Sequence, residues 1–123
     1  MEITIIDLFG LLLAHLIGDF FLQSDETAKN KSSDDMVLTR HVAIYTMPFA
    51  FIAFFTFPFI LAIGFLAVNA VLHYATDYVS SRVAKSYWEK EDRHNFFVTI
   101  GIDQFIHIMS LTWTFAFLKS LMT

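Results

Sequence analysis

Four long apolar stretches, separated by polar segments or by a proline, dominate the pattern of residues along the chain. They cover about residues 3–23, 40–57, 59–79 and 96–119. Each is close to the roughly 20 apolar residues that a helix needs to cross the hydrocarbon core of a bilayer. The pattern therefore predicts an all-α fold: an integral membrane bundle of four transmembrane helices with short connections, forming one domain over residues 1–123.

The connections between the predicted spans differ in polarity. Pro58 separates the second span from the third within the uncharged sequence TFPF, so a very short turn is expected there, because proline cannot continue a helix. The other two connections, residues 24–39 and 80–95, are polar. The second of them could hold a short interfacial helix, with Tyr87 and Trp88 at headgroup level, or a plain solvated loop.

Basic residues are distributed unevenly between the two ends of the predicted spans. Seven of the eight lie in or beside the two polar connections: Lys29, Lys31, Arg40, Arg82, Lys85, Lys90 and Arg93. On the opposite side there is only Lys119 and the terminal amine. By the positive-inside tendency, both polar loops are expected in the cytoplasm and both termini outside. Glu2 stands where a signal peptide would carry positive charge, so the first apolar stretch is interpreted as a mature span.

Composition strengthens the membrane assignment. The chain has 123 residues, of which 56% are hydrophobic and 16% charged, and its mean hydropathy is +0.57. A soluble domain of this size could not bury so much apolar surface in one core. The net charge of −4 is spread over mixed-sign loops, so no nucleic acid is expected as a partner, and the absence of cysteine excludes disulfides and thiolate metal sites. The expected partner is the lipid bilayer.

Histidine and aspartate recur four residues apart inside the predicted spans. The pairs are His15 with Asp19, His73 with Asp77, and Asp103 with His107. Residues at this spacing are neighbours on the surface of a helix. With the topology above, the three pairs and His41, at the start of the second span, share one layer near the cytoplasmic side of the membrane. His94 lies in a polar connection and does not join them.

Ionisable groups at this depth need a reason to be there. An ionised carboxylate inside a bilayer costs at least about 2.5 kcal/mol on insertion scales, and such groups persist where they pair or bind a cation. Neutral histidine and carboxylate suit zinc, manganese or iron, and a helix bundle can direct several of them into one cavity. The predicted metal ligands are His15, Asp19, His41, His73, Asp77, Asp103 and His107. Two divalent ions are expected, with zinc preferred over manganese or iron, because one ion would leave two or three ligands without a role.

Other polar residues near the predicted ligands are candidates for orienting them or for touching a substrate. These candidates are Gln23, Lys31, Tyr45, Asn69 and Gln104. One of the three aspartates, Asp19, Asp77 or Asp103, could act as a general base instead of a ligand. Basic residues at the cytoplasmic ends could steer an anionic headgroup toward the site, the candidates being Lys31, Arg40, Arg82 and Lys85.

The His/Asp pattern is also compatible with three different roles. For an isolated pair, a hydrogen bond within one helix is the simpler interpretation. The same ladder could carry protons or a divalent cation in a transport module, although the outer halves of the spans offer no continuing polar path, and four short helices would need a homo-oligomer to form a conduit. A non-enzymatic phage or envelope protein could use the cluster as a structural metal site. Three pairs and His41 at one depth favour a shared functional site.

The sequence segments HLIGDFFLQ, LTRHVAIY, HYATDY and DQFIHI occur in this order and extend over nearly the whole chain. Together they resemble an uncharacterised family of small bacterial and phage membrane proteins, domain-of-unknown-function family 3307. This resemblance implies an integral membrane fold, here in a bacterial inner (plasma) membrane, but no activity. In the style of its site the chain also resembles the membrane-bound metal-dependent hydrolases of bacteria. Our hypothesis is a hydrolase with a His/Asp centre near the cytoplasmic interface, acting on a phosphoester or a lipid-linked substrate.

Overall fold

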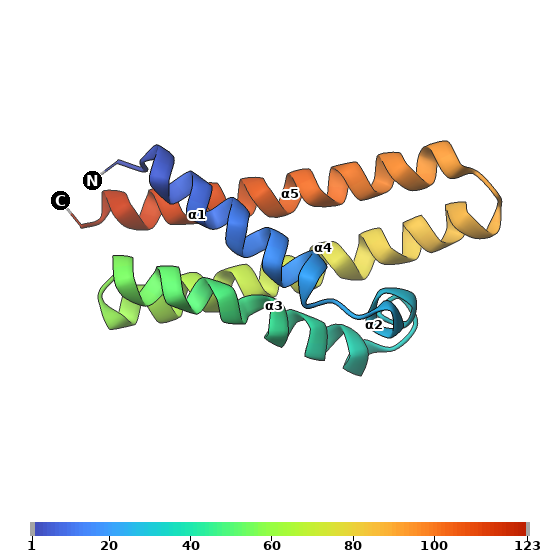
Figure 1. The fold of residues 1–123 in the computed structure, drawn as a ribbon, viewed down its shortest axis with the longest axis horizontal. Coiled ribbons are helices and arrows are strands. Elements are labelled where there is room, and N and C mark those ends of the chain that lie inside the picture. The colour runs from blue at the N-terminus through green and yellow to red at the C-terminus, as the bar shows by residue number, and fades with distance from the viewer. Residues whose placement is uncertain (1, 123) are drawn as a thin grey trace.

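Helices make up nearly all of the computed structural model, which describes residues 2–122 (Figure 1). In chain order they are α1 (Ile5–Leu16), the π-helix η1 (Ile17–Phe21), α2 (Asp25–Asn30), α3 (Asp35–Thr56), α4 (Phe59–Glu89) and α5 (Arg93–Ser120). No strand occurs within residues 2–122, so the all-α prediction is confirmed.

Three of these helices, α3, α4 and α5, are long and apolar enough to cross a membrane. They correspond to the second, third and fourth predicted spans. Large apolar side chains are exposed along them, for example Phe55 at 85% and Trp113 at 68%, as is typical of surfaces that face lipid. The first predicted span is not confirmed as a crossing, because α1 is only 12 residues long and its continuation η1 ends at Phe21.

The helices extend further into the polar segments than the sequence pattern predicted. Residues 80–95 form neither a plain loop nor a separate short helix, because α4 continues to Glu89 and α5 begins at Arg93. Similarly, α2 and the start of α3 occupy much of the expected loop 24–39. Polarity alone does not end a helix. The segment SSRVAKSYWEK lacks proline and glycine, and it contains several good helix formers.

Side chains cap the starts of four helices, α1, α2, α3 and α5. Asp34 caps α3 by accepting a hydrogen bond from the backbone N–H of Met36 at 2.9 Å. Asp92 caps α5 by accepting from the backbone N–H of Asn95 at 3.1 Å. That hydrogen bond holds the pKa of the exposed Asp92 carboxyl below its usual value, because it stabilises the ionised form.

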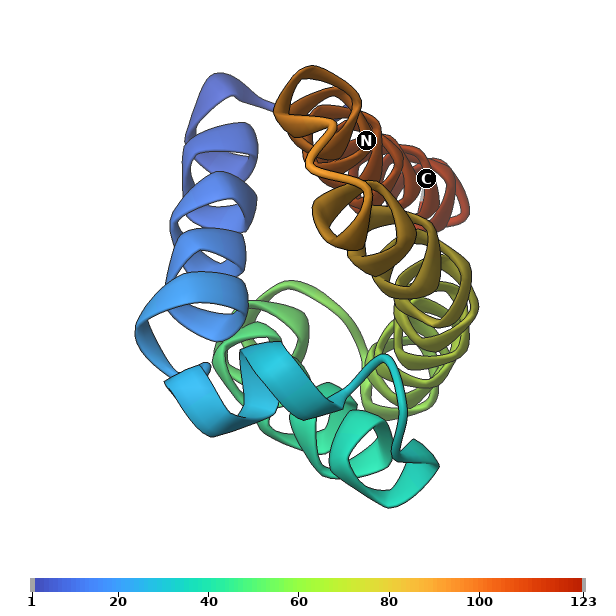
Figure 2. The same ribbon diagram turned by 90° about the vertical axis from the view of Figure 1, so that its right-hand side faces the viewer.

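The long helices α4 and α5 run antiparallel and side by side, and α3 packs along the first half of α4 (Figure 1). The segment α1 crosses α3 and α5, so the helices enclose a common interior when the molecule is viewed from its end (Figure 2). Both termini and the α3–α4 turn lie at one end of the molecule. The α4–α5 connection lies at the other end, and α2 lies toward it (Figure 1).

An apolar core fills the interior toward the end with the termini. It is built from small and aromatic side chains of α1, α3, α4 and α5, including Phe49, Phe65 and Phe115. The rings of Phe65 and Phe115 meet edge to face with their centroids 5.6 Å apart. Beyond this core, the Lys119 ammonium donates to the Asp7 carboxylate at 2.6 Å and so joins α5 to α1, a pair that the sequence pattern did not predict.

The π-helix brings the chain very close to α3. A Cβ atom at Gly18 would lie 2.8 Å from the backbone oxygen of Tyr45, so only glycine allows this approach. The next residue, Asp19, is thereby buried against α3. Short π-helical turns are frequent at functional sites, and this one places a carboxylate in the interior.

We predict that Gly18→Ala destabilises the protein by about 1–3 kcal/mol, because the added methyl group forces η1 and α3 apart. Gly64→Ala is the matched control, since a Cβ there meets nothing within 4 Å. Thermal unfolding in detergent measures the difference. Equal unfolding temperatures of the two variants would contradict the close approach.

Candidate metal centre

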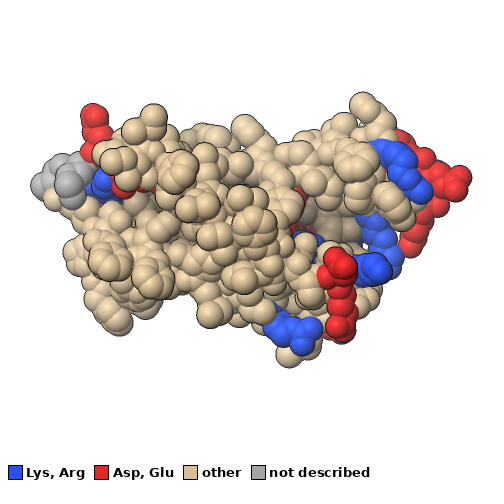
Figure 3. Space-filling model, in the orientation of Figure 1, with Lys and Arg blue, Asp and Glu red and all other residues tan. Residues whose placement is uncertain are grey.

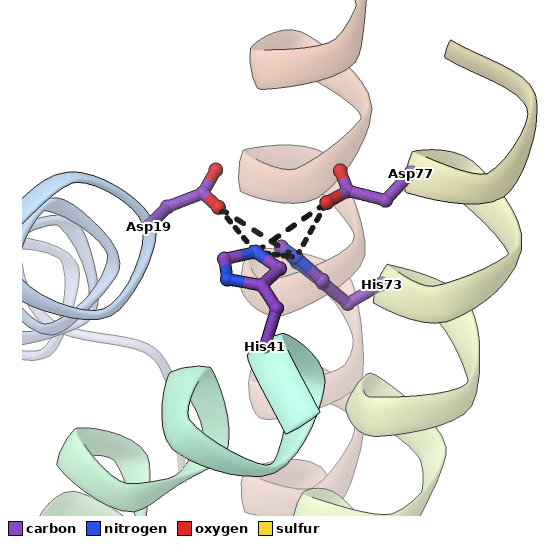
Figure 4. A group of neighbouring side chains, drawn as sticks. All are labelled: Asp19, His41, His73 and Asp77. Carbon is purple, nitrogen blue, oxygen red and sulfur yellow. Dashed lines mark hydrogen bonds and ion pairs between the residues drawn. The ribbon is translucent and has the colours of Figure 1, made fainter. Parts of the chain in front are cut away.

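The seven residues predicted as ligands come together in the interior, between η1 and α3 on one side and α4 and α5 on the other. Each is buried, with at most 6% of its surface exposed. Figure 4 shows four of them, Asp19, His41, His73 and Asp77, directed toward one point from three different segments. The i, i+4 spacing therefore places each pair on the inward face of its helix.

Four ligand atoms form the first group: Asp19 Oδ1, His41 Nε2, His73 Nε2 and Asp77 Oδ2. The His41 nitrogen lies 3.1 Å from Asp19 and 3.4 Å from Asp77. The His73 nitrogen lies 3.6 Å from Asp19 and 3.3 Å from Asp77, and the two nitrogens are 3.2 Å apart. Ligands at about 2.0–2.1 Å around a tetrahedral zinc ion are separated by about 3.3 Å, so five of the six edges match such a site.

Hydrogen bonding alone does not account for this arrangement. Each imidazole Nε2 carries at most one hydrogen, so His41 and His73 can supply two hydrogens for the five close contacts within the group. The remaining contacts would bring lone pairs or negative charge together in a buried place. A cation at the common point satisfies all four atoms at once.

A second group lies next to the first and consists of Asp19, Asp103 and His107. His107 Nε2 is 3.3 Å from Asp103 Oδ2 and 3.0 Å from Asp77 Oδ1. Asp19 belongs to both groups, and Asp77 contacts histidines of both through its two oxygens. The two groups thus share a carboxylate, and each could hold a cation.

The charges of the buried side chains also favour a cation. Asp19, Asp77 and Asp103 supply three carboxylates to the cluster, and the nearest fixed positive charge is Lys31, whose ammonium donates to Asp77 Oδ2 at 2.9 Å. With neutral histidines, the ionised group carries two uncompensated negative charges. Buried charge without compensation is costly, and a divalent ion would neutralise it.

Gln104 connects the carboxylates of the cluster. Its amide nitrogen donates to Asp19 Oδ2 and to Asp103 Oδ2, both at 3.0 Å. Its oxygen then accepts from His15 Nε2 at 2.6 Å. The Oγ of Ser80 donates to Asp103 from the other side. These contacts orient the carboxylates, as partners of metal ligands commonly do.

His15 is buried beside the cluster but stands outside both groups of candidate ligands. Because Nε2 donates to Gln104, Nδ1 is free to accept a hydrogen bond from the Tyr45 hydroxyl, 3.1 Å away. Its closest approach to Asp19 is 3.9 Å. Both ring nitrogens of His15 thus already have neutral partners, unlike those of His41 and His73 that face the common point.

Aromatic stacking holds His73 in place. Its ring lies between those of Tyr45 and His107, with centroid distances of 3.7 and 4.0 Å. His73 Nδ1 is buried without a hydrogen-bond partner among the described residues, so stacking and the contacts of Nε2 orient the ring.

Several of the remaining candidates lie away from the ligand atoms. Asn69 donates to the Phe65 carbonyl at 3.0 Å and to Thr114 Oγ1 at 2.8 Å, which serves helix packing. Arg82 pairs with Asp35 at 3.1 Å on the surface. Gln23 lines a pocket beside the cluster together with Lys31.

Ser80 was not among the candidates predicted from the sequence. The spacing of His73, Asp77 and Ser80 is i, i+4, i+7, which marks one face of a helix and could have indicated it. The interhelical contact of Ser80 with Asp103 could not be foreseen from spacing.

Taken together, the fold and the site define a helical protein with three candidate transmembrane helices and a buried His/Asp cluster that could hold metal. The chain belongs to the family described as protein of unknown function (DUF3307), whose family model matches residues 8–123. This confirms the resemblance inferred from the four sequence motifs. No curated protein and no solved structure matches the chain.

We predict that Tyr45→Phe lowers the stability by about 1–3 kcal/mol, because it leaves the buried Nδ1 of His15 without its donor while the ring stacked on His73 is kept. Tyr45→Ala should cost more, about 3–5 kcal/mol, because it also opens a cavity. Tyr78→Phe, at an exposed tyrosine, is the control. Thermal unfolding in detergent would contradict the assignment if Tyr45→Phe behaved like the control.

Proposed function

We propose that this protein is an integral membrane metal-dependent hydrolase with a dinuclear His/Asp centre near the cytoplasmic interface of a bacterial inner membrane. The observation that carries the proposal is the first group, in which four ligand atoms approach one another at 3.1–3.6 Å with too few hydrogens to bridge them. A site of histidine and carboxylate ligands suits zinc best, and manganese or iron are the alternatives.

The proposal assigns different roles to the two groups. Asp19, His41, His73 and Asp77 offer four protein ligands to one ion, whereas the second group offers Asp19 and His107 as ligands, has Asp103 beside them, and leaves room for water or substrate. His15 is then a residue that orients Gln104 rather than a ligand. Divalent ions in such a pair supply a water that is nucleophilic near neutral pH and stabilise negative charge on phosphoryl oxygens.

Asp103 is the best candidate for the general base. Its side chain is 8% exposed, whereas that of Asp77 is 1% exposed. It also lines a groove between α4 and α5, so it can meet a substrate that the deeper carboxylates cannot. In this role Asp103 Oδ would accept a proton from the attacking water, while Ser80 and Gln104 hold the carboxylate in position.

The same groove supports a lipid-linked substrate. It has a volume of about 540 Å³ and is lined mainly by apolar side chains, among them Val79, Val83, Ile102 and Ile106. Its polar members include Ser80 and Asp103, which belong to the cluster. An isoprenoid or acyl chain could lie in the groove, with its phosphoester beside Asp103.

The proposed topology has four spans, with α1 and η1 as the first. Their 17 residues would reach about 25 Å, a few ångströms less than the hydrocarbon core, a mismatch that bilayers accommodate at modest cost. Exposed Ile5, Phe9 and Phe21 support contact with lipid. The concentration of charged side chains toward the α4–α5 connection supports placing that end in the cytoplasm and both termini outside (Figure 3).

The transport alternative has less support. Between the cluster and the Asp7–Lys119 pair, the interior is filled by the apolar core that contains Phe49, Phe65 and Phe115. The polar pair of Asn69 and Thr114 in this region is engaged in a hydrogen bond between α4 and α5. The structural-metal alternative differs from the hydrolase in predicting bound metal without turnover of a phosphoester.

We predict about two equivalents of zinc, manganese or iron in the detergent-purified protein, measured by elemental mass spectrometry. The double variant His73→Ala/Asp103→Ala should lose both, because it removes one polar side chain from each group of closely spaced His and Asp atoms. His94→Ala, outside the cluster, should keep them. A folded wild type without stoichiometric metal after incubation with each of these ions would refute the metal centre.

We further predict that the metal-loaded protein releases phosphate from phosphoesters, tested with a water-soluble aryl phosphate and with isoprenyl and diacylglycerol phosphates. Asp103→Asn should lower the rate by about 10²–10⁴-fold, because an amide cannot accept the proton. His94→Ala is the matched control. If wild type binds metal but hydrolyses none of these, and Asp103→Asn only lowers the unfolding temperature, the site is structural.

A further inference from the structure

A second polar feature lies directly beside the cluster, on the side of α2. It is a pocket of about 430 Å³ between the segment around α2 and the distal parts of α4 and α5. Figure 3 shows the molecule hollowed in this region, with basic side chains nearby. The polar side chains that line it include Gln23, Lys29, Lys31, Ser81 and Lys85.

The lining of this pocket combines apolar side chains, among them Trp88, Phe96 and Ile100, with an excess of positive charge. Lys29, Lys31 and Lys85 contribute three ammonium groups, against one carboxylate from Glu89. Lys31 pairs with Asp77 at 2.9 Å, whereas Lys29 and Lys85 take part in no ion pair with the described residues. Two of the three positive charges are therefore available to an anion.

The pocket also contains polar atoms that lack partners. Gln23 Oε1 and Ser81 Oγ are both buried without a hydrogen-bond partner among the described residues. Burying such groups unpaired is costly, so a ligand that pairs them is favoured. The Ser81 hydroxyl can donate to an oxygen, and the Gln23 amide can turn to present its N–H groups.

Lys31 connects this pocket to the proposed metal centre. Its side chain lines the pocket while its ammonium contacts Asp77 Oδ2, the oxygen that also faces His41 and His73. An anion held by the lysines would therefore lie next to the cluster. Ammonium, hydroxyl and amide donors around one pocket are suited to the several acceptor oxygens of a phosphate group.

We propose that this pocket binds a phosphate group, with Lys29, Lys85, Ser81 and Gln23 as donors and Lys31 positioned between it and the metal ligands. The inference deepens the proposed function, on which its link to hydrolysis rests: the pocket takes the phosphate that hydrolysis releases. Among the basic residues predicted to steer an anion, Lys31 and Lys85 line this pocket, whereas Arg40 and Arg82 do not.

The test is phosphate binding to the full-length protein in nanodiscs of phosphatidylcholine, loaded with zinc and measured by isothermal titration with inorganic phosphate. We expect saturable binding that Lys29→Gln/Lys85→Gln weakens at least tenfold. The matched control Lys90→Gln/Arg40→Gln removes the same charge outside the pocket and should change the affinity less than twofold. Equal weakening by both double variants, or no saturable binding, would overturn the proposal.

A second arm separates lipid from soluble phosphate. In nanodiscs that contain phosphatidic acid, a lipid headgroup in the pocket should compete and weaken the binding of inorganic phosphate. Unchanged affinity would assign the pocket to a soluble phosphate compound. Phosphate binding that depends on Lys29 and Lys85 supports the site in either kind of nanodisc. Phosphate binding that does not depend on these two lysines counts against the site.

These experiments distinguish failure of the phosphate-pocket assignment from failure of the hydrolase proposal. If metal and hydrolysis are found but Lys29→Gln/Lys85→Gln binds phosphate like wild type, the pocket assignment fails and the hydrolase stands. If no metal binds, the titration is repeated without zinc. Phosphate binding that still depends on these two lysines would then keep the pocket and remove the hydrolase.

Discussion

The burial of three carboxylates against three imidazole nitrogens, in one small volume, is the constraint on which the rest of this structure depends. Asp19, Asp77 and Asp103 carry more negative charge than Lys31 can balance, and the nitrogens of His41 and His73 have too few hydrogens for their close contacts. Such a group is stable only if a cation or additional protons compensate it. The need for compensating positive charge distinguishes the cluster from the apolar residues around it.

The surrounding helices keep the ligand atoms in place. Gly18 lets η1 approach α3 closely enough to bury Asp19, and Tyr45, on the same helix as His41, stacks on His73 of α4. Gln104 links two carboxylates with His15, so that η1, α1 and α5 are joined through one amide. On one side the apolar core closes the interior, whereas on the other the pocket around Lys31 connects it with the charged end of the molecule.

Much of the fold and of the candidate site could be predicted from single residues and their spacing. Three of the long helices follow from apolar length alone, because the cost of exposing backbone in lipid leaves a helix as the simplest spanning structure. The His/Asp pairs follow from the helical repeat. Helix ends were predicted poorly, since α4 runs on through the polar segment after Val79 to Glu89, where helix propensity outweighs polarity. Ser80 and the Asp7–Lys119 pair were missed because their partners are distant in sequence.

By itself, the sequence determined that the chain is all-α with long apolar helices, that it belongs to its family, and which histidines and aspartates lie on inward helix faces. These properties depend on local composition and on a repeat of about 3.6 residues. Only the tertiary structure decided that Asp19 is shared by two groups of ligand atoms, that His15 is occupied by Gln104 and Tyr45, and that Lys31 joins the cluster to a basic pocket. Those relations join residues 22 to 89 positions apart, and distances between such residues are set by helix packing and not by any local repeat.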